Sequence, residues 1–234
     1  MLNLNYTEKF MEKAVNNNYR FERKLVINSH EYEDLILLFK SRGFNQLYPE
    51  RNICNIYLDD LNYHSYFDNI HGNNKRIKHR IRWYGNLFGL IKKITLEQKI
   101  KRGTVGKKIN FKIEKEFLFS KNLNHIQLTK LVRGLLCGLK NKIFIGLLYP
   151  TSINTYTRSY YSDSLSRFRI TFDKNIKYYS LHNKIKLQKS DERIIVEIKY
   201  DNENDIYTNE LLNFVNFRLA KNSKYVHGIE AIKF

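Results

Sequence analysis

The segment RIKHRIRWYG, residues 76–85, places a cation at every second position: Arg76, Lys78, Arg80 and Arg82. Successive side chains of a β-strand point to opposite faces, so a strand here lines four cations along one face. Neighbouring like charges on that face repel by about 0.6 kcal/mol in bulk water and by about 2.4 kcal/mol at an effective dielectric constant of about 20. An enclosed row therefore needs counter-charges, and the chemistry open to it is the binding of a dense polyanion.

Other expected strands repeat this alternation and add acidic residues. The spacing Glu-x-Lys occurs three times, at Glu22/Lys24, Glu97/Lys99 and Glu197/Lys199. Arg158 lies between tyrosines in TYTRSYY, and Arg167 and Arg169 share a face of SRFRITFD.

Two architectures produce such a pattern. In one, the apolar faces form the core and the charged faces meet water. In the other, a barrel encloses a charged lumen, and helices cover its apolar outer face. The glutamates of a charged lumen would either pair with lysines or hold a divalent metal ion. The alternation alone leaves both architectures open.

Composition indicates the class of partner. The 234 residues carry a formal net charge of +18, which favours a polyanion: nucleic acid, an anionic membrane or a phosphate-rich small molecule. The sequence is also rich in Asn, Ile, Lys and Tyr. An AT-rich genome produces this composition, so only part of the positive charge is evidence for a polyanionic partner. Cys54 and Cys137 form no zinc motif, and no apolar run reaches the roughly 20 residues of a membrane helix. The start lacks the apolar stretch of a signal peptide, so we expect a cytoplasmic protein without a membrane segment.

The elements that would position these residues are mostly strands. We expect strands over 19–27, 52–60, 76–85, 90–103, 107–119, 150–162, 166–173 and 192–200, with 90–103 and 107–119 forming a hairpin. We expect helices over 6–17, 30–42, 61–72, 124–139 and 205–221, with Ser29 capping the second and Gly43 ending it. No linker, repeat or βαβ rhythm divides the chain, so a single domain, 1–234, of mostly β (α+β) class follows.

Several familiar motifs are absent. RGTVGKK has glycines too close together for a phosphate-binding P-loop. The seven His residues are scattered, and no HExxH, zinc-finger or RNA-recognition signature occurs, so no specific nucleic-acid partner is predicted.

The sequence resembles the polyphosphate-polymerase (VTC) domain, within the triphosphate tunnel metalloenzyme superfamily, over roughly residues 19–228. The matching pieces, in the family's order, are YRFERKLVI, NIYLDD followed by Tyr66 and Gly72, RIKHRIRWYG, LEQKIKRG, TYTRSYY, SRFRITFD, VEIKY and NSKYVHGI. The resemblance implies an antiparallel β-barrel tunnel with surrounding helices. It also implies a basic interior that binds a nucleotide triphosphate with a divalent metal, Mn²⁺ or Mg²⁺.

The resemblance also implies roles for individual residues. Phosphate- or nucleotide-binding positions match Lys24, Arg80, Arg82, Lys99, Lys108, Arg158, Arg169 and Ser223. Glu197 matches the metal-binding carboxylate, and Lys224 matches a C-terminal helix residue needed for activity. Lys107 and Lys112 compete with Lys108 for its place. Glu22 and Glu97 are further candidates for metal ligands, but we expect them to form ion pairs that orient the lysines.

The expected activity is transfer of the terminal phosphate of ATP onto a growing polyphosphate chain. A triphosphatase of the same fold and a non-catalytic polyphosphate- or nucleotide-binding module remain as alternatives. The family's eukaryotic complexes add a sensing domain and membrane helices, and we expect neither within these 234 residues. Its oligomeric state cannot be read from the sequence.

Overall fold

The computed structural model of the chain describes residues 20–103, 105–139, 148–207, 211 and 218–233. Within them the fold is mostly β. The main antiparallel sheet contains β1 (Arg20–Ile27), β2 (Asn45–Asp59), β3 (Lys75–Tyr84), β5 (Ile94–Arg102), β6 (Val105–Ile113), β8 (Tyr149–Ser162), β9 (Phe168–Ser180), β10 (Lys186–Asp191) and β11 (Ile194–Asp201). A small second sheet pairs β4 (Gly89–Ile91) with β7 (Phe117–Phe119).

The main sheet curls strongly but does not close into a barrel. Its strand order is β10-β9-β11-β1-β6-β5-β3-β2-β8, and β8 also pairs with β9. Between β1 and β6 the register joins a single pair, Arg20 and Gly106. Further along β1, Leu25 bridges Leu219, and the N–H of Ala220 donates to the carbonyl of Lys24 at 2.8 Å. The C-terminal segment therefore takes up part of the β1 edge that β6 would need, and the expected closed barrel is not confirmed.

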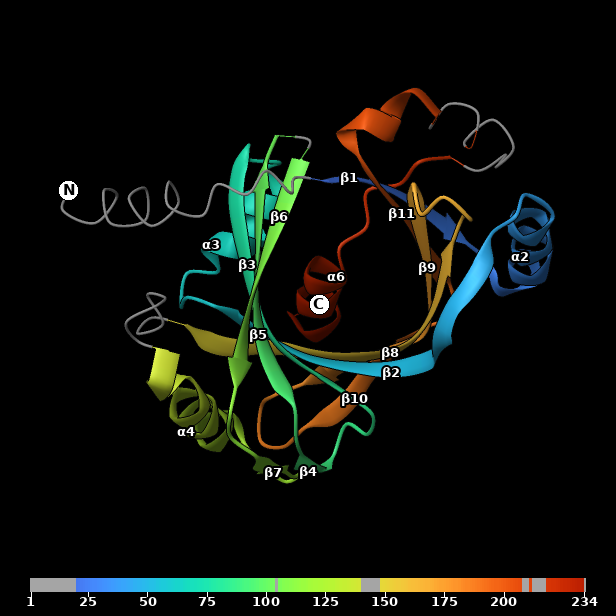
Figure 1. Cartoon of the computed structure of the whole chain (residues 1–234). Helices are drawn as coiled ribbons and strands as arrows, with labels where there is room; N and C mark the ends of the chain where they lie inside the picture. The colour runs from blue at the N-terminus through green and yellow to red at the C-terminus, as the bar shows by residue number, and fades with distance from the viewer. Residues whose placement is uncertain (1–19, 104, 140–147, 208–210, 212–217, 234) are drawn as a thin grey trace.

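The described helices are α2 (Tyr32–Ser41), α3 (His64–Ile70), α4 (His125–Leu136) and α6 (Lys224–Lys233), with 3₁₀ turns at Ser29–Glu31, Cys137–Leu139 and Asn202–Asn204. Figure 1 shows α6 on the concave side of the curled sheet, and α2 and α4 outside it. None of the described helices has the length and apolarity needed to cross a membrane.

The helix cap predicted at Ser29 is wrong by one residue. Asn28 precedes the helical turn, and its N–H donates to the Glu31 carboxylate at 2.7 Å, which is half of a capping box. The predicted end is confirmed: Gly43 follows α2 with φ of +79°, a conformation that glycine adopts without strain.

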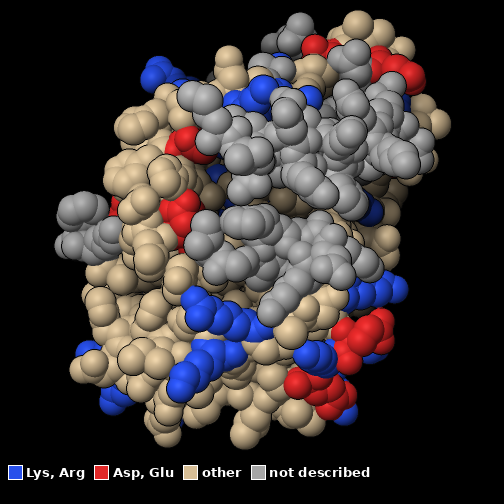
Figure 2. Space-filling model, turned by 90° about the vertical axis from the view of Figure 1, so that its left-hand side faces the viewer, with Lys and Arg blue, Asp and Glu red and all other residues tan. Residues whose placement is uncertain are grey.

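The surface in Figure 2 carries charges of both signs. On the described part of this face, Lys and Arg side chains form several separate patches, and Asp and Glu groups lie beside them. The described part of this face therefore shows no single continuous basic surface.

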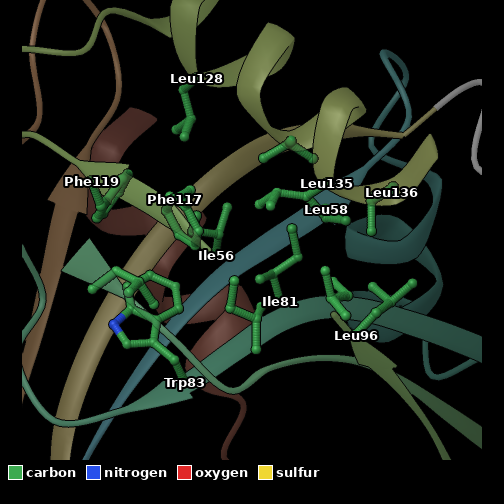
Figure 3. Close-up of a cluster of buried hydrophobic side chains, with 14 of the residues drawn as sticks. Ile56, Leu58, Ile81, Trp83, Leu96, Phe117, Phe119, Leu128, Leu135 and Leu136 are labelled. Atoms are coloured by element: carbon green, nitrogen blue, oxygen red, sulfur yellow. The ribbon is translucent and has the colours of Figure 1, made fainter. Parts of the chain in front are cut away.

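The apolar strand faces point outward and are covered by helices. Figure 3 shows Ile81, Trp83 and Leu96 of the sheet beneath Leu128 and Leu135 of α4. A second cluster packs α2 against the sheet: Leu35, Phe39, Leu25, Ile27, Phe172 and Val196. Because the apolar faces point outward, the charged faces of the same strands point to the concave side. The structure thus has the charged interior, one of the two architectures that the alternation allowed.

Several predicted elements differ from the structure. The hairpin expected over 90–103 and 107–119 breaks into four strands, because Lys93 adopts φ of +53° between β4 and β5 and β6 ends at Ile113. This break brings Phe117 and Phe119 edge-on against Trp83.

The other differences concern length and coverage. β2 starts seven residues earlier than predicted, β9 continues to Ser180, and β10 was not predicted because KLQKSD lacks β-branched and aromatic residues. The helix expected over 6–17, and most of that expected over 205–221, lie outside the described residues.

Candidate functional site

A cavity of about 490 Å³ is formed by inward-facing side chains of the curled sheet and by the start of α6. Twelve of its lining residues are Lys or Arg and three are Glu, so cations exceed carboxylates on the wall. All the site residues predicted from the sequence lie on this wall: Lys24, Arg80, Arg82, Lys99, Lys108, Arg158, Arg169, Glu197, Ser223 and Lys224. The structure brings them together, whereas their individual roles stay predictions.

Antiparallel register assembles one side of the cavity. Lys78 and Arg80 of β3 lie opposite Lys99 and Glu97 of β5, and Lys99 also lies opposite Lys108 of β6. Residues directly opposite in antiparallel strands project from the same face. The period-two alternation of each strand is thereby converted into a two-dimensional array of charge.

Glu97, which is 4% exposed, is the centre of the first ion cluster. Its carboxylate lies 2.5 Å from Arg80 Nη2, 3.3 Å from Arg82 Nη1 and 3.1 Å from Lys108 Nζ. Burial raises the pKa of Glu97, but the three cations outweigh burial and hold that pKa well below its usual range. The carboxylate stays ionised and keeps two guanidinium groups side by side.

The other donors of these arginines are also engaged. Arg82 Nε donates to Asn55 at 2.9 Å and Arg82 Nη2 to the Tyr156 hydroxyl at 2.8 Å. Arg80 Nη1 donates to the Tyr57 hydroxyl at 3.3 Å. Because the planar guanidinium is fixed at several atoms, its orientation is set before any ligand arrives.

Glu22 and Glu197 form the second ion cluster around Lys24. Lys24 Nζ lies 3.2 Å from Glu22 and 3.3 Å from Glu197. Lys99 pairs with Glu22 at 2.8 Å, and Lys199 pairs with Glu197 at 3.0 Å. Burial opposes the charge on Lys24, yet the two carboxylates raise its pKa above the usual value. One ammonium group is thus held between two carboxylates.

The third cluster joins the sheet to α6 through Asp173, which is fully buried. Arg158 binds Asp173 through two nitrogens, with Nη2 at 2.6 Å, and Lys224 Nζ donates to the same carboxylate at 2.5 Å. Lys224 Nζ also lies 4.8 Å from the centre of the Tyr156 ring. Burial raises the pKa of Asp173, but Arg158 and Lys224 outweigh it and lower that pKa.

The segment that leads into α6 is tied to strand lysines. Lys24 Nζ donates to the carbonyl of Asn222 at 2.8 Å, and Lys78 Nζ donates to the Ser223 hydroxyl at 2.8 Å. Tyr225 donates to Asp59, which also accepts backbone N–H groups at the start of α3. These contacts fix Lys224, the first residue of α6, at the cavity wall.

Arg169 differs from the other arginines of the wall. It is exposed and pairs with no carboxylate among the described residues, while Lys199 lies opposite it in the register. Its guanidinium donors are therefore available to a ligand.

Sequence reasoning missed four residues of the site. Asp173 is the last residue of the strand expected over 166–173 and was assigned no role. It nevertheless lies on the same strand face as Arg169 and Thr171. Lys78 belonged to the cationic row but received no role, and Asn55 and Tyr156 gave no signal apart from strand alternation.

The carboxylates of the cavity do not make a complete metal site. Among the described residues, no group of three His, Cys, Asp or Glu side chains could hold a metal ion. Two carboxylates of the cavity, Glu22 and Glu197, lie on either side of Lys24 and share its ammonium group.

Comparisons with known proteins identify the family and the fold of the chain. The sequence profile of the VTC domain matches residues 19–233. A putative adenylyl cyclase from Hippeastrum, described by a dominant triphosphatase activity, has a similar fold, with a TM-score of 0.51 and 14% identity over 91% of this chain and 96% of that one. A putative adenylate cyclase from Vibrio parahaemolyticus is similar at a TM-score of 0.50 and 10% identity, covering 88% of this chain and 97% of that one. No curated protein sequence matches the chain.

Proposed function

We propose that this chain, which belongs to the VTC domain family, binds ATP and polyphosphate in its basic cavity and transfers the terminal phosphate of ATP onto the growing chain. The observation that carries the proposal is the convergence of twelve Lys and Arg residues, against three Glu, on one cavity wall. Phosphoryl transfer depends mainly on positioning and on stabilising charge at the transferring group, which such a wall supplies.

Phosphate binding would be shared among the strand cations and Ser223. Arg80, Arg82 and Arg158 are already oriented by carboxylates, and Arg169 lines the cavity without a carboxylate partner among the described residues. Planar guanidinium groups bind phosphate oxygens in pairs, and the lysines Lys24, Lys99 and Lys108 add compact charges.

Lys224 is the proposed catalytic cation. It enters the cavity from the start of α6, apart from the strands that form the rest of the wall. During transfer the bond from the γ-phosphorus to the β,γ-bridging oxygen breaks, and ADP leaves with the electron pair. A terminal oxygen of the polyphosphate chain forms the new bond, so one phosphoanhydride replaces another and no net proton is exchanged. A positive group at Lys224 would stabilise the charge of the transferring phosphoryl group.

A divalent cation fits the carboxylates present. Glu197 and Glu22 lie within 3.3 Å of the same ammonium group, so this position already accommodates a cation. Mg²⁺ is commonly held by one or two carboxylates together with substrate phosphates, which suits a cavity without a complete ligand set. We propose that Glu197 holds Mn²⁺ or Mg²⁺ together with the triphosphate. The bound ion would neutralise phosphate charge and help to orient the terminal phosphate.

A triphosphatase activity is the second candidate. The similar Hippeastrum protein is described by a dominant triphosphatase activity. In this chain the same cavity would position water in place of the polyphosphate terminus. The two reactions share the phosphate-binding residues and differ only in the acceptor.

One experiment separates these reactions. Purified protein is incubated with ATP and Mn²⁺, and ADP, free phosphate and polyphosphate chains are measured together. We expect ADP and chains in matching amounts. ADP with free phosphate and without chains would establish the triphosphatase, and binding of ATP without ADP release would establish a binding module.

Selectivity for narrow polyanions gives a second test. Duplex DNA binding needs a broad basic surface, whereas this chain collects its cations inside a cavity. We expect calorimetry at matched salt to show tighter binding of tripolyphosphate than of duplex DNA. Equal affinities, or a preference for DNA, would support a nucleic-acid module instead.

A further inference from the structure

An aromatic cluster lies at the edge of the basic cavity. The Arg51 guanidinium carbon is 4.8 Å from the centre of the Tyr48 ring and 5.8 Å from the centres of the Tyr84 and Tyr160 rings. Tyr48 and Tyr160 also meet edge-to-face, with ring centres 5.7 Å apart. Tyr84 and Tyr160 are themselves part of the cavity wall.

Strand geometry places this cluster directly beyond the phosphate-binding arginines. Tyr84 follows Arg82 by two residues on β3, and Tyr160 follows Arg158 by two residues on β8. Both strands pair antiparallel with β2, so β3 and β8 run in the same direction. On both strands the step from arginine to tyrosine therefore leads to the same end of the cavity, about 6.5–7 Å further along.

The cluster is not used for packing the core. Tyr84 is 51% exposed and Tyr48 is 41% exposed, and neither belongs to a buried hydrophobic cluster of the described residues. Arg51 pairs with no carboxylate of the described part of the chain; the neighbouring Glu50 pairs with Lys174 at 2.7 Å instead. Exposed aromatic rings, and a guanidinium that contacts them but pairs with no carboxylate of the described residues, lie next to the cationic cavity wall and form a stacking surface for a planar ring.

We propose that Tyr48, Arg51, Tyr84 and Tyr160, the tyrosine mouth, bind the base of the nucleotide whose triphosphate lies in the cavity. This inference rests on the proposed function and assigns the part of ATP that the strand cations do not bind. Stacking on aromatic rings and on Arg is tolerant of base identity. The tyrosine mouth would therefore distinguish nucleotides from inorganic polyphosphate more strongly than it distinguishes ATP from GTP.

The test compares ligands with and without a base. Calorimetry with Mg²⁺ measures the affinity of the β,γ-imido analogue of ATP and of inorganic imidotriphosphate, both of which resist phosphoryl transfer. One stacked base contributes roughly 5- to 150-fold in affinity. We expect Tyr84→Ala to weaken the ATP analogue by at least about fivefold and to leave imidotriphosphate binding within error. Tyr84→Phe should retain the wild-type affinities, since the ring remains.

A matched control is Phe67→Ala, which removes a ring that is 46% exposed on α3 and does not line the cavity. It should change neither affinity. If Tyr84→Ala affects both ligands equally or neither ligand, the tyrosine mouth does not bind the base, although the cavity still binds phosphate. If neither ligand binds the wild-type protein, the proposed function fails and the inference fails with it.

Discussion

Glu97 and Glu197 occupy the same position in two copies of one motif, yet their surroundings differ. Both glutamates are buried in the cavity wall, at 4% and 7% exposure, and each faces three cations. The cations of Glu97 (Arg80, Arg82 and Lys108) have no second carboxylate among the described residues. Of the cations around Glu197, Lys24 also contacts Glu22, and Arg158 is bound by Asp173.

This difference indicates that the two glutamates have different roles. Within the described part of the chain, Glu97 is the only acid that pairs with Arg80 and Arg82, so we infer that its role is to orient them. Glu197 can lose its share of Lys24 and Arg158 without leaving either cation unpaired, and only Lys199 would lose its one carboxylate partner among the described residues. We therefore propose that Glu197 is the carboxylate that exchanges a cation partner for a metal ion when a triphosphate binds. Identical spacing in the sequence therefore does not imply an identical role.

The largest expected effect is on stability. Glu97→Gln leaves two arginines and a lysine without a counter-charge, and loss of one partner from a buried ion pair costs about 3–5 kcal/mol. Glu197→Gln should cost about 1 kcal/mol, because the lost contacts are partly replaced by Glu22 and Asp173. Urea unfolding of both variants checks this, and equal losses would remove the distinction between the two clusters.

The next effect is on turnover. Lys224→Ala should lower the ATP turnover number by about 100-fold, the effect of removing one group that stabilises transition-state charge. Binding of imidotriphosphate, set mainly by the strand arginines, should weaken only modestly. Steady-state ADP release and calorimetry measure the two quantities. A loss of affinity as large as the loss of turnover would assign Lys224 to binding alone.

A third prediction concerns Arg169, the arginine of the cavity wall that pairs with no carboxylate among the described residues. Because it orients no carboxylate among the described residues, Arg169→Ala should weaken tripolyphosphate binding by about tenfold, the weight of a charge-assisted contact, without lowering the urea midpoint. Arg167→Ala is the matched control, since Arg167 pairs with Asp163 at 3.0 Å and does not line the cavity. An equal effect of both substitutions on affinity would mean that only overall charge matters.

The smallest effect is a pH dependence. Burial lowers the pKa of Lys99 to about 8, although Glu22 partly offsets this shift. A polyanion binds the protonated form, so tripolyphosphate affinity should fall as the pH rises through that value. The decrease should be roughly two- to fivefold, the weight of one partly exposed charge pair. Lys99→Arg, whose guanidinium remains charged, should flatten this part of the profile; an unchanged profile in the variant would exclude Lys99 as its source.

The sequence predicted the cavity wall well because the relevant rule is local. A strand alternates its faces, and antiparallel neighbours share a face, so the charged rows of paired strands such as β3 and β5 lie side by side. The alternation allowed these rows to face either solvent or an enclosed space, and only the family resemblance implied the enclosed arrangement. The register that sets Lys24 opposite Glu197 was not needed for that conclusion.

The remaining features depend on distant parts of the chain. Asp173 gained its place from contacts with Arg158 and with Lys224, which lies 51 residues later. The break at Lys93 and the incomplete pairing of β1 with β6 follow from tertiary packing, which overrides strand propensity. The alternation of residues along a strand contains no information about the break at Lys93 or about the incomplete pairing of β1 with β6.

The metal dependence of ATP turnover tests whether Glu197 holds the metal ion. ADP release is measured across a range of Mn²⁺ and Mg²⁺ concentrations for the wild-type protein, Glu197→Gln and Glu97→Gln, at a temperature where all three are folded. Glu197→Gln should need at least about tenfold more metal for half-maximal turnover, because loss of a charged ligand costs about 1.4 kcal/mol or more. Glu97→Gln should keep the wild-type metal midpoint. Turnover of ATP by Glu197→Gln at the normal rate and with the normal metal midpoint would contradict the assignment of Glu197.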